Sequence, residues 1–366
     1  MNKLLTLFLA AVMGSFLSMT AVGEEKSTNG DFEFSKPYKH GNLTIFFVKG
    51  KETFKGEIMG LDEAMKQKKL IVHETGNVNK LSVQNNGDVA IYIQAGDIVK
   101  GGKQDRVLAV DLVVPPKSGK IAINSFCVEQ GRWAKRSGES LQKFNGNAYT
   151  INGKGLRNAV KGRVGSQGKV WTHIQAQQSK LSKNIKENVK SGKSATSLQL
   201  TLENKKLQEE TKKMTAVFEK AKDENKDAIG MVFFVNNKFS SADVYGNKKM
   251  FKMMWSKLIN ASVTEALSEK DEKTAEFPKD WKKNIFGDVK IVKKNELKSP
   301  AFNTYEVEEA DKILRYNSKL KTKSIHRSWD HKSKDYKKES SNGNFRNGRN
   351  FNNNLNPQDQ LQQRSR

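Results

Sequence analysis

Cysteine is almost absent from this chain of 366 residues, in which Cys127 is the only one. A single cysteine excludes an internal disulfide, and a chain of this length can bury enough apolar surface to fold without one. A thiol that is exposed in an oxidising compartment is readily modified. We therefore expect Cys127 to be a small buried hydrophobic residue rather than a nucleophile.

Signatures of metal and cofactor sites are also missing. The five histidines have no zinc-motif spacing with a cysteine. The chain has no calcium-binding loop, no GxSxG elbow, no GxGxxG fingerprint and no Walker A loop. We predict no metal centre, and the sequence indicates no particular cofactor. The carboxylates that leave a hard-cation site open as an alternative are Asp97, Asp105, Asp111 and Glu129.

Long apolar runs are confined to the N-terminus. A short basic opening precedes the apolar residues 4–19, and small residues follow at 21–23. This order predicts a secretory signal peptide over residues 1–23. The run is short for a bilayer span of about 20 residues, and no other stretch is apolar enough to cross a membrane. We therefore expect an exported protein, periplasmic or secreted, with no transmembrane segment after cleavage.

Acidic residues are too few to balance the basic ones. The formal net charge is +25 at pH 7. Such a charge favours an anionic small molecule or an acidic polymer as the partner. Nucleic-acid binding would be non-specific, because the chain has no RNP motif, no zinc finger and no aromatic stacking platform.

The pattern of apolar residues predicts an α+β fold. Residues 24–36 are polar and expected to be flexible, and residues 37–267 are expected to form a single domain. Residues 37–130 predict an antiparallel-rich β module. Its expected strands lie at 43–48, 70–74, 81–83, 89–93, 107–114 and 120–128. The segment Asn85-Asn86-Gly87-Asp88 predicts a hairpin turn between two of them.

The remainder of the chain is expected to be mostly helical or irregular. Residues 134–168 predict a long loop, and a lysine-rich helical hairpin is inserted at about 172–225. A β-hairpin at 228–244 and an amphipathic helix at 248–266 complete the domain. Residues 268–320 are expected to form a helical or irregular extension, and residues 321–366 predict a disordered, basic, Asn-rich tail.

The first of two polar clusters at strand ends is GGKQDR, residues 101–106. Adjacent glycines let the backbone turn several N–H groups toward one anion, and basic side chains add charge and donors. The predicted ligand-binding residues of this cluster are Gly101, Gly102, Lys103, Gln104 and Arg106. The alternative is a glycine turn closed by a local ion pair.

The second polar cluster is CVEQGRW, residues 127–133. Glu129 is a candidate general base, and its alternative roles are metal ligand and salt-bridge partner. Asp105 of the first cluster is the other candidate base. The predicted ligand-binding residues here are Gln130, Arg132 and Trp133. Trp133 would stack on a flat ligand or on Arg132, or else pack in the core.

These segments resemble those of a known family. GDIVKGGKQDRV, VVPP and CVEQGRW look like the hallmark of the ARG and Rhodanese-Phosphatase-superfamily-associated Protein domain, and the resemblance resumes at residues 228–261. It covers roughly residues 37–267. The resemblance implies little biochemistry, because the family name reflects association with ADP-ribosylglycohydrolases and rhodanese-phosphatases. That association implies a role in ADP-ribose or NAD-derived metabolism.

The leading hypothesis is an exported domain that binds or processes a phosphorylated anionic ligand, with Asp105 or Glu129 as the base. The first alternative is a non-catalytic exported module that holds an acidic polymer through its basic helices and tail. The second alternative is non-specific nucleic-acid binding. The sequence leaves open whether the protein is an enzyme.

Overall fold

The computed structural model describes residues 32–161, 166–270, 272–288, 290–299, 303–333 and 336. The predicted signal peptide and most of the predicted tail lie outside these residues. The described part of the chain confirms the α+β fold, with antiparallel sheets and seven helices. No helix in this part is both long and apolar enough to cross a bilayer.

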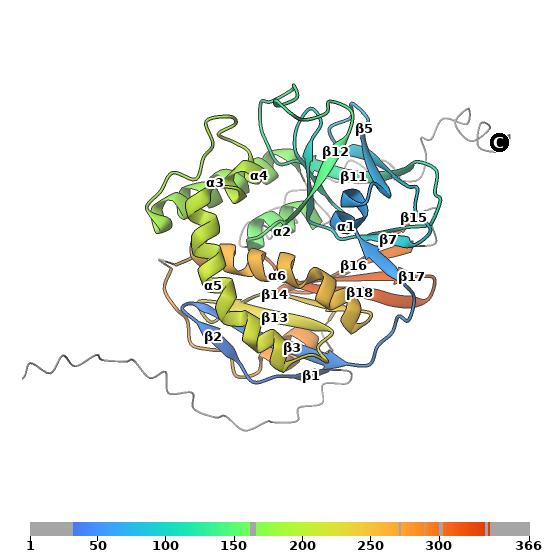
Figure 1. Cartoon of the computed structure of the whole chain (residues 1–366). Helices are drawn as coiled ribbons and strands as arrows, with labels where there is room; N and C mark the ends of the chain where they lie inside the picture. Colours follow the sequence, from blue (N-terminus) through green and yellow to red (C-terminus); the bar gives the residue numbers. More distant parts are fainter. Residues whose placement is uncertain are drawn as a thin grey trace, which may run out of the picture.

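The largest sheet has nine strands and occupies the lower part of Figure 1. Its strand order is β1-β3-β13-β14-β18-β17-β16-β15, and β2 pairs with β3. Its first strands are β1 (Phe32–Phe34), β2 (Tyr38–His40), β3 (Leu43–Gly50), β13 (Gly230–Val235) and β14 (Lys238–Tyr245). Its last strands are β15 (Lys293–Ser299), β16 (Asn303–Glu309), β17 (Ile313–Leu320) and β18 (Lys323–His331).

The β module lies above this sheet and is built from two smaller sheets (Figure 1). A six-stranded sheet contains β12 (Phe144–Thr150), β8 (Asp97–Gly101), β9 (Arg106–Leu108), β11 (Ile121–Cys127), β6 (Lys80–Asn85) and β5 (Leu70–Glu74), in that order. A three-stranded sheet contains β10 (Leu112–Val114), β7 (Ala90–Ile93) and β4 (Ile58–Gly60). Apolar residues of these strands pack with helix α1 (Leu61–Lys66) into one core cluster.

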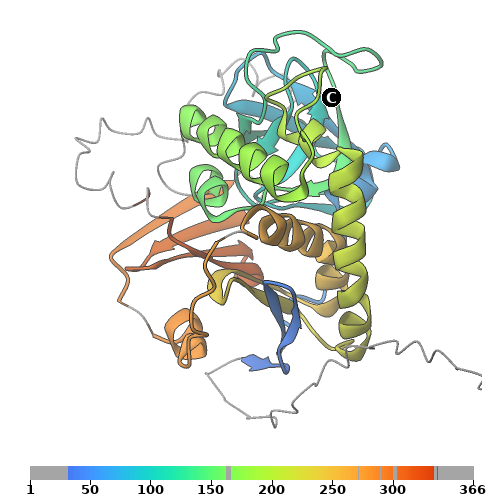
Figure 2. The ribbon, with the colours of Figure 1, turned by 90° about the vertical axis from the view of Figure 1, so that its left-hand side faces the viewer.

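Helix α6 (Lys248–Ser268) lies between the β module and the nine-stranded sheet, as Figures 1 and 2 show. It contacts β12 on one side and β13 and β14 on the other. Two further long helices, α3 (Gln167–Ile185) and α5 (Lys205–Glu224), pack on α6. The short helices are α2 (Lys154–Lys161), α4 (Leu198–Leu202) and α7 (Trp281–Phe286). Because α6 is covered on several sides, most of its residues are buried.

Several elements confirm the sequence-based predictions. Strands β13 and β14 form the expected hairpin, in which Asn236 and Asn237 have φ of +52° and +60°. Asparagine tolerates this left-handed conformation better than other side chains, which is why the pair is a hairpin signal. Helix α6 and the two long helices α3 and α5 lie where the apolar pattern placed them, with boundaries that shift by a few residues.

The predicted hairpin at residues 85–88 is wrong. Strand β6 pairs with β5 and β11, whereas β7 pairs with β10 and β4. The Asn85 side chain donates to the carbonyls of Val89 and Val114 and accepts from the Gly87 N–H. The Asn85 side chain therefore stabilises the segment in which the chain passes from one sheet to another, rather than a turn within one sheet.

Two more predictions near the module need correction. The expected loop at 134–168 contains β12 and α2. The predicted strand at 43–48 exists as β3, but it pairs with β13 in the large sheet and is not part of the module. Local sequence could not show the pairing of β3 with β13 or of β12 with β8, because in each pair the two strands lie far apart along the chain.

The predictions for the C-terminal third are wrong over residues 293–331. The expected extension at 268–320 contains helix α7 and strands β15, β16 and β17, and the expected disorder from 321 onward is replaced by β18 up to His331. These strands are rich in lysine and glutamate, which lowers their apparent strand propensity. Alternate residues such as Tyr305, Val307 and Trp329 are nonetheless buried. The predicted flexible segment at 24–36 likewise includes β1.

Candidate functional site

The two predicted polar clusters meet because the strands that flank them pair. Strand β9 begins at Arg106, β11 ends at Cys127, and these two residues are register partners. Just beyond them, Gln104 Nε2 donates to the Glu129 carbonyl at 3.0 Å. We call residues 101–106 and 127–139 together the signature cluster.

The two candidate bases, Asp105 and Glu129, are buried and neutralised by two arginines. Arg136 donates to the two Asp105 carboxylate oxygens at 2.5 and 2.9 Å and lies 3.5 Å from Glu129. Arg132 donates to Glu129 at 2.7 Å and lies 3.5 Å from Asp105. Both carboxylate side chains are 0% exposed. In this arrangement Glu129 is a salt-bridge partner, one of the roles that the sequence left open, and neither carboxylate faces solvent.

The glycine turn has the backbone shape of an anion nest, but the protein itself supplies the acceptors. Gly101 and Gly102 have φ of +123° and +57°. The Gly101 N–H donates to Asp105 Oδ1 at 3.0 Å, and the Gly102 N–H donates to the Ser140 carbonyl at 3.1 Å. A Cβ at Gly102 would lie 2.4 Å from the Phe144 ring, so this close approach requires glycine.

Arg106 is completely buried and serves the interior of the module. Its Nη2 lies 3.5 Å from Glu74 Oε2, and its Nη1 donates to the Gln104 carbonyl at 3.2 Å. Its Nε is buried without a hydrogen-bond partner among the described residues. The structure therefore places this predicted anion-binding arginine where an external ligand has no access to it.

Three of the predicted ligand-binding residues lie toward solvent. The Trp133 side chain is 50% exposed, and Lys103 Nζ lies 5.2 Å from the centroid of its ring. Gln130 is exposed, and its backbone N–H and carbonyl both bind the Thr196 hydroxyl. The outer edge of the signature cluster is thus a lysine–tryptophan pair rather than a closed site.

Cys127 is buried, as the sequence predicts. Burial raises the pKa of its thiol to about 11, with Arg106 opposing the effect, so the thiol stays protonated at neutral pH. Among the residues that the structure describes, no three His, Cys, Asp or Glu side chains group closely enough to hold a metal ion.

A second set of buried charges, which the sequence did not indicate, joins the module to the nine-stranded sheet. His326 lies between Asp111 and Asp243, with N–O distances of 2.7 and 3.2 Å, and its ring stacks on Tyr245. Burial alone would lower the pKa of His326, but the two carboxylates raise it to about 9. The interpretation of His326 as part of a disordered tail is therefore wrong.

Helix α2 adds a further buried network at this junction. Arg157 lies 2.8 Å from Glu265 of α6 and 3.2 Å from Asp330 of β18, and Lys161 lies 3.0 Å from Asp330. These charges come from segments predicted to be a loop, a helix and a tail. Their proximity could not be found without the strand pairing that brings β18 beside β14.

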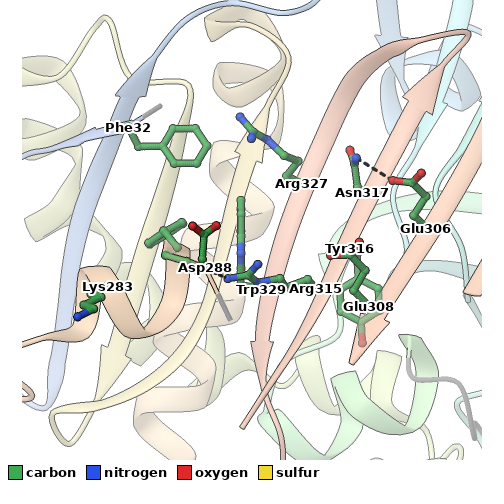
Figure 3. Close-up of a pocket in the computed structure, with 12 residues that line it drawn as sticks. Phe32, Lys283, Asp288, Glu306, Glu308, Arg315, Tyr316, Asn317, Arg327 and Trp329 are labelled. Carbon is green, nitrogen blue, oxygen red and sulfur yellow. Dashed lines mark hydrogen bonds between the residues drawn. The ribbon is translucent and has the colours of Figure 1, made fainter. Parts of the chain in front are cut away.

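An open groove lined by three cationic and three acidic side chains lies on the nine-stranded sheet, and we call it the outer groove (Figure 3). It has a volume of about 600 Å³ and is bounded by β1, the end of α7 and the strands β16, β17 and β18. The cations along it are Lys283, Arg315 and Arg327. The aromatic rings along it include Phe32, Phe286 and Trp329, which contact one another.

The two arginines of the outer groove are held in place by their surroundings. The Arg327 guanidinium lies over the Phe32 ring, 4.5 Å from its centroid. Arg315 Nη2 donates to the carbonyls of Ile285 and Gly287 at the end of α7. Burial lowers the pKa of Arg315, although Glu308 and Asp288 oppose the effect. None of these residues was singled out from the sequence, because they lie in the segments predicted to be an extension and a tail.

The family comparison covers both the β module and the nine-stranded sheet. The family model described as the ARG and Rhodanese-Phosphatase-superfamily-associated Protein domain, ARPP-1, matches residues 31–331. The chain belongs to this family. Comparison with curated proteins gave no match, and neither did comparison with solved structures.

The match corrects the extent of the family domain. The sequence-based resemblance covered roughly residues 37–267, whereas the ARPP-1 match includes β1 at one end and β15–β18 at the other. The outer groove and the His326 network therefore lie inside the ARPP-1 domain. The signature cluster, which carried the resemblance in the sequence, does not line the outer groove.

Proposed function

We propose that this ARPP-1 protein binds a phosphorylated anionic ligand in the outer groove. The observation that carries the proposal is the pair of guanidinium groups, Arg315 and Arg327, beside aromatic rings in a groove of about 600 Å³. Planar guanidinium groups bind phosphate and carboxylate oxygens through paired hydrogen bonds. A volume of several hundred Å³ is typical of sites for small molecules.

The charge balance of the outer groove supports an anion. Its sheet carboxylates have lysine partners, since Glu306 lies 2.8 Å from Lys319 and Glu308 lies 3.1 Å from Lys294. Those lysines offset the two sheet carboxylates, which leaves Lys283, Arg315 and Arg327 against the one remaining carboxylate of the lining, Asp288. Burial disfavours the charged form of Arg315, and an incoming anion would stabilise that form.

The aromatic wall supports a ligand that has a flat ring as well as an anionic group. The half-buried Phe286 ring offers apolar area against which a heteroaromatic ring can pack, and it contacts the buried rings of Phe32 and Trp329. On the association implied by the family name, ADP-ribose is the first compound to test. If residues 1–23 direct export, as proposed, the ligand is met outside the cytoplasm.

The proposal is for binding and assigns no catalysis to Asp105 or Glu129, because their oxygens are engaged with Arg132 and Arg136. The acidic-polymer alternative receives less support. Part of the lysine charge of α5 is neutralised within the helix, since Lys206 and Lys213 both pair with Glu210.

The test is calorimetric titration of the full-length protein with ADP-ribose, AMP and inorganic phosphate. Arg327→Gln should weaken binding of the phosphorylated compounds by about tenfold or more, the loss typical of one hydrogen bond to a charged group. Lys193→Gln is the matched control, because it removes one positive charge from an exposed residue outside the groove.

Equal binding by wild type and by folded Arg327→Gln would contradict the proposed site. Absence of binding for all three compounds at millimolar concentration would contradict the proposed ligand class. Arg315→Gln serves as a second groove variant, with a thermal melt to show that each variant remains folded.

A further inference from the structure

The segments that join the strands at one end of the six-stranded sheet lie next to one another. Strand β8 ends at Gly101 opposite Phe144, where β12 begins, and β11 ends beside the start of β9. Strand β5 ends beside the start of β6. The segments that meet at this end are therefore residues 75–80, 102–105 and 128–143. We call them together the loop end, and it includes the solvent side of the signature cluster.

Contacts between the three segments hold them side by side. The Glu74 N–H, at the end of β5, donates to the Gln142 carbonyl at 2.9 Å. A Cβ at Gly76 would lie 4.0 Å from Lys103 Nζ. The same Nζ lies 5.2 Å from the centroid of the Trp133 ring. The three segments therefore present one surface.

Exposed apolar side chains gather on the loop end. Trp133 is 50% exposed, Leu141 is 43% exposed and Val78 is 40% exposed. Across the described part of the chain, only two other large apolar side chains are at least as exposed as Val78, namely Val217 and Val292. Single apolar side chains on a surface are ordinary, whereas their grouping at one place is typical of a contact surface.

Burial separates the two signs of charge at the loop end. The four carboxylates there are no more than 8% exposed, and each lies within 3.5 Å of an arginine: Glu74, Asp105, Glu129 and Glu139. The lysines reach solvent instead. Lys103 is half-buried, and three others are exposed: Lys80, Lys135 and Lys143. A partner at this surface therefore meets apolar side chains and positive charge.

The turns of the loop end project from the β module. A Cβ at Gly131 or at Gly138 would meet no atom within 4 Å, so no described part of the chain covers these two turns. No residue of the loop end lines the outer groove. Peptide partners commonly fill a groove or extend a sheet edge, whereas the loop end lies at the ends of the strands. A broad, flat partner with negative charge fits this shape better.

We infer that the loop end docks on the surface of an anionic lipid bilayer, with Trp133 and Leu141 in the headgroup region. Tryptophan favours this region because its ring is apolar and its N–H is polar. The surrounding lysines attract lipid phosphates while their apolar stems lie along the bilayer surface. Electrostatic attraction and burial of apolar area together determine how tightly such a surface binds. The inference does not depend on the outer groove or its ligand.

The experiment is co-sedimentation of residues 24–366 with lipid vesicles. Residues 1–23 are omitted because their apolar run would bind a bilayer by itself, and every described element remains. One set of vesicles is phosphatidylcholine alone, and the other is an equal mixture of phosphatidylcholine and phosphatidylglycerol. We expect binding to the mixed vesicles to be at least about tenfold tighter than binding to the neutral ones, because the lysines attract anionic headgroups.

The first pair of variants tests the exposed apolar side chains. The double variant Trp133→Ala, Leu141→Ser should weaken binding to the mixed vesicles by at least about tenfold, because it removes the apolar area that the bilayer would bury. The double variant Val217→Ser, Val292→Ser is the matched control. It removes exposed apolar side chains outside the loop end and should bind like wild type.

The second pair of variants tests the lysines. The double variant Lys135→Gln, Lys143→Gln should weaken binding to the mixed vesicles by about tenfold, because two cations leave the docking surface. The double variant Lys212→Gln, Lys220→Gln removes the same charge from exposed positions on α5 and should bind like wild type. Thermal melts show whether each variant remains folded.

The inference is overturned if the mixed vesicles are not bound, if the neutral vesicles are bound equally tightly, or if a folded loop-end variant binds like wild type. The last result would place vesicle binding on another basic surface of the chain. Binding of polyglutamate without binding of vesicles would overturn the inference in favour of an acidic protein partner.

Discussion

The signature cluster and the outer groove both present pairs of arginines beside carboxylates, yet they use them in opposite ways. In the signature cluster, Arg132 and Arg136 lie within 3.5 Å of both Asp105 and Glu129, and the four groups close on one another. In the outer groove the neighbouring sheet carboxylates are paired with lysines instead. The same residue types form a closed, buried ion network in one region and line an open groove in the other.

The difference shows that the partners of an arginine, more than its charge, decide whether it can bind an external anion. A buried guanidinium that already has carboxylate partners has little to gain from an external anion. A guanidinium whose neighbours are neutralised elsewhere still attracts one. The segment that carried the family resemblance in the sequence is therefore not the segment that lines the open groove.

The largest effect should come from breaking the signature cluster. Glu129→Gln leaves Arg132 and Arg136 with a single buried carboxylate partner between them, Asp105, apart from Glu139 at the edge. Removing one member of a buried ion network typically costs about 3–5 kcal/mol of unfolding free energy. Urea denaturation should show this loss. Asp88→Asn is the control, because it removes one carboxylate whose side chain is 85% exposed. A loss below about 1 kcal/mol would mean that the cluster is not structural.

The His326 network extends the comparison to a third set of charges and predicts a pH effect. The folded-state pKa of His326 is raised to about 9, so its stabilisation is fully present below pH 6.5 and is lost as pH rises through about 9. The shift corresponds to about 3 kcal/mol at most. Unfolding free energies measured from pH 6 to 10 should fall in wild type. The same decline in His326→Gln would show that another group causes it.

A smaller effect separates two glycines of the signature cluster. Gly102→Ala places a Cβ against the Phe144 ring at a φ of +57°, whereas Gly131→Ala, at a φ of +87°, meets no atom within 4 Å. Both variants should lose about 1 kcal/mol from the left-handed backbone, and Gly102→Ala should lose about 1–3 kcal/mol more from the clash. Thermal melts of the two variants test this, and equal losses would contradict the close packing at Gly102.

The smallest effect should come from the solvent side of the signature cluster. Trp133 is half exposed and pairs with Lys103 through its ring, and an exposed contact of this kind is worth about 0.5–1 kcal/mol. Trp133→Ala should therefore lower the unfolding free energy by no more than about 1 kcal/mol and leave ligand binding in the outer groove unchanged. A large loss would show that the tryptophan packs as a core residue, which the sequence had left open.

Local signals in the sequence identified elements whose neighbours lie nearby along the chain. Asn236 and Asn237 mark a hairpin, because their backbone conformation alone decides the turn. The same kind of signal failed at Asn85, where side-chain hydrogen bonds to Val89 and Val114 join two sheets. A turn residue indicates a change of direction, and the partner of each strand is decided by packing elsewhere.

The candidate site was predictable in part. The pairing of β9 with β11 brings GGKQDR and CVEQGRW together, as both clusters border predicted strands. Their closure into an internal network was not predictable, because it depends on Arg136 and Ser140 in a segment expected to be a loop. The outer groove was missed entirely, since its arginines alternate with buried residues on strands that looked like a polar extension and tail.

The sequence by itself determined the family, the α+β class, the burial of Cys127 and the abundance of positive charge. These properties depend on residue identity and short-range pattern. Only the tertiary structure decided which charges neutralise one another, because ion pairs such as Asp111–His326 and Asp97–Lys257 join residues more than 150 positions apart. Their distances are fixed by strand pairing and by the packing of α6 between two layers, and no local pattern in the chain encodes those contacts.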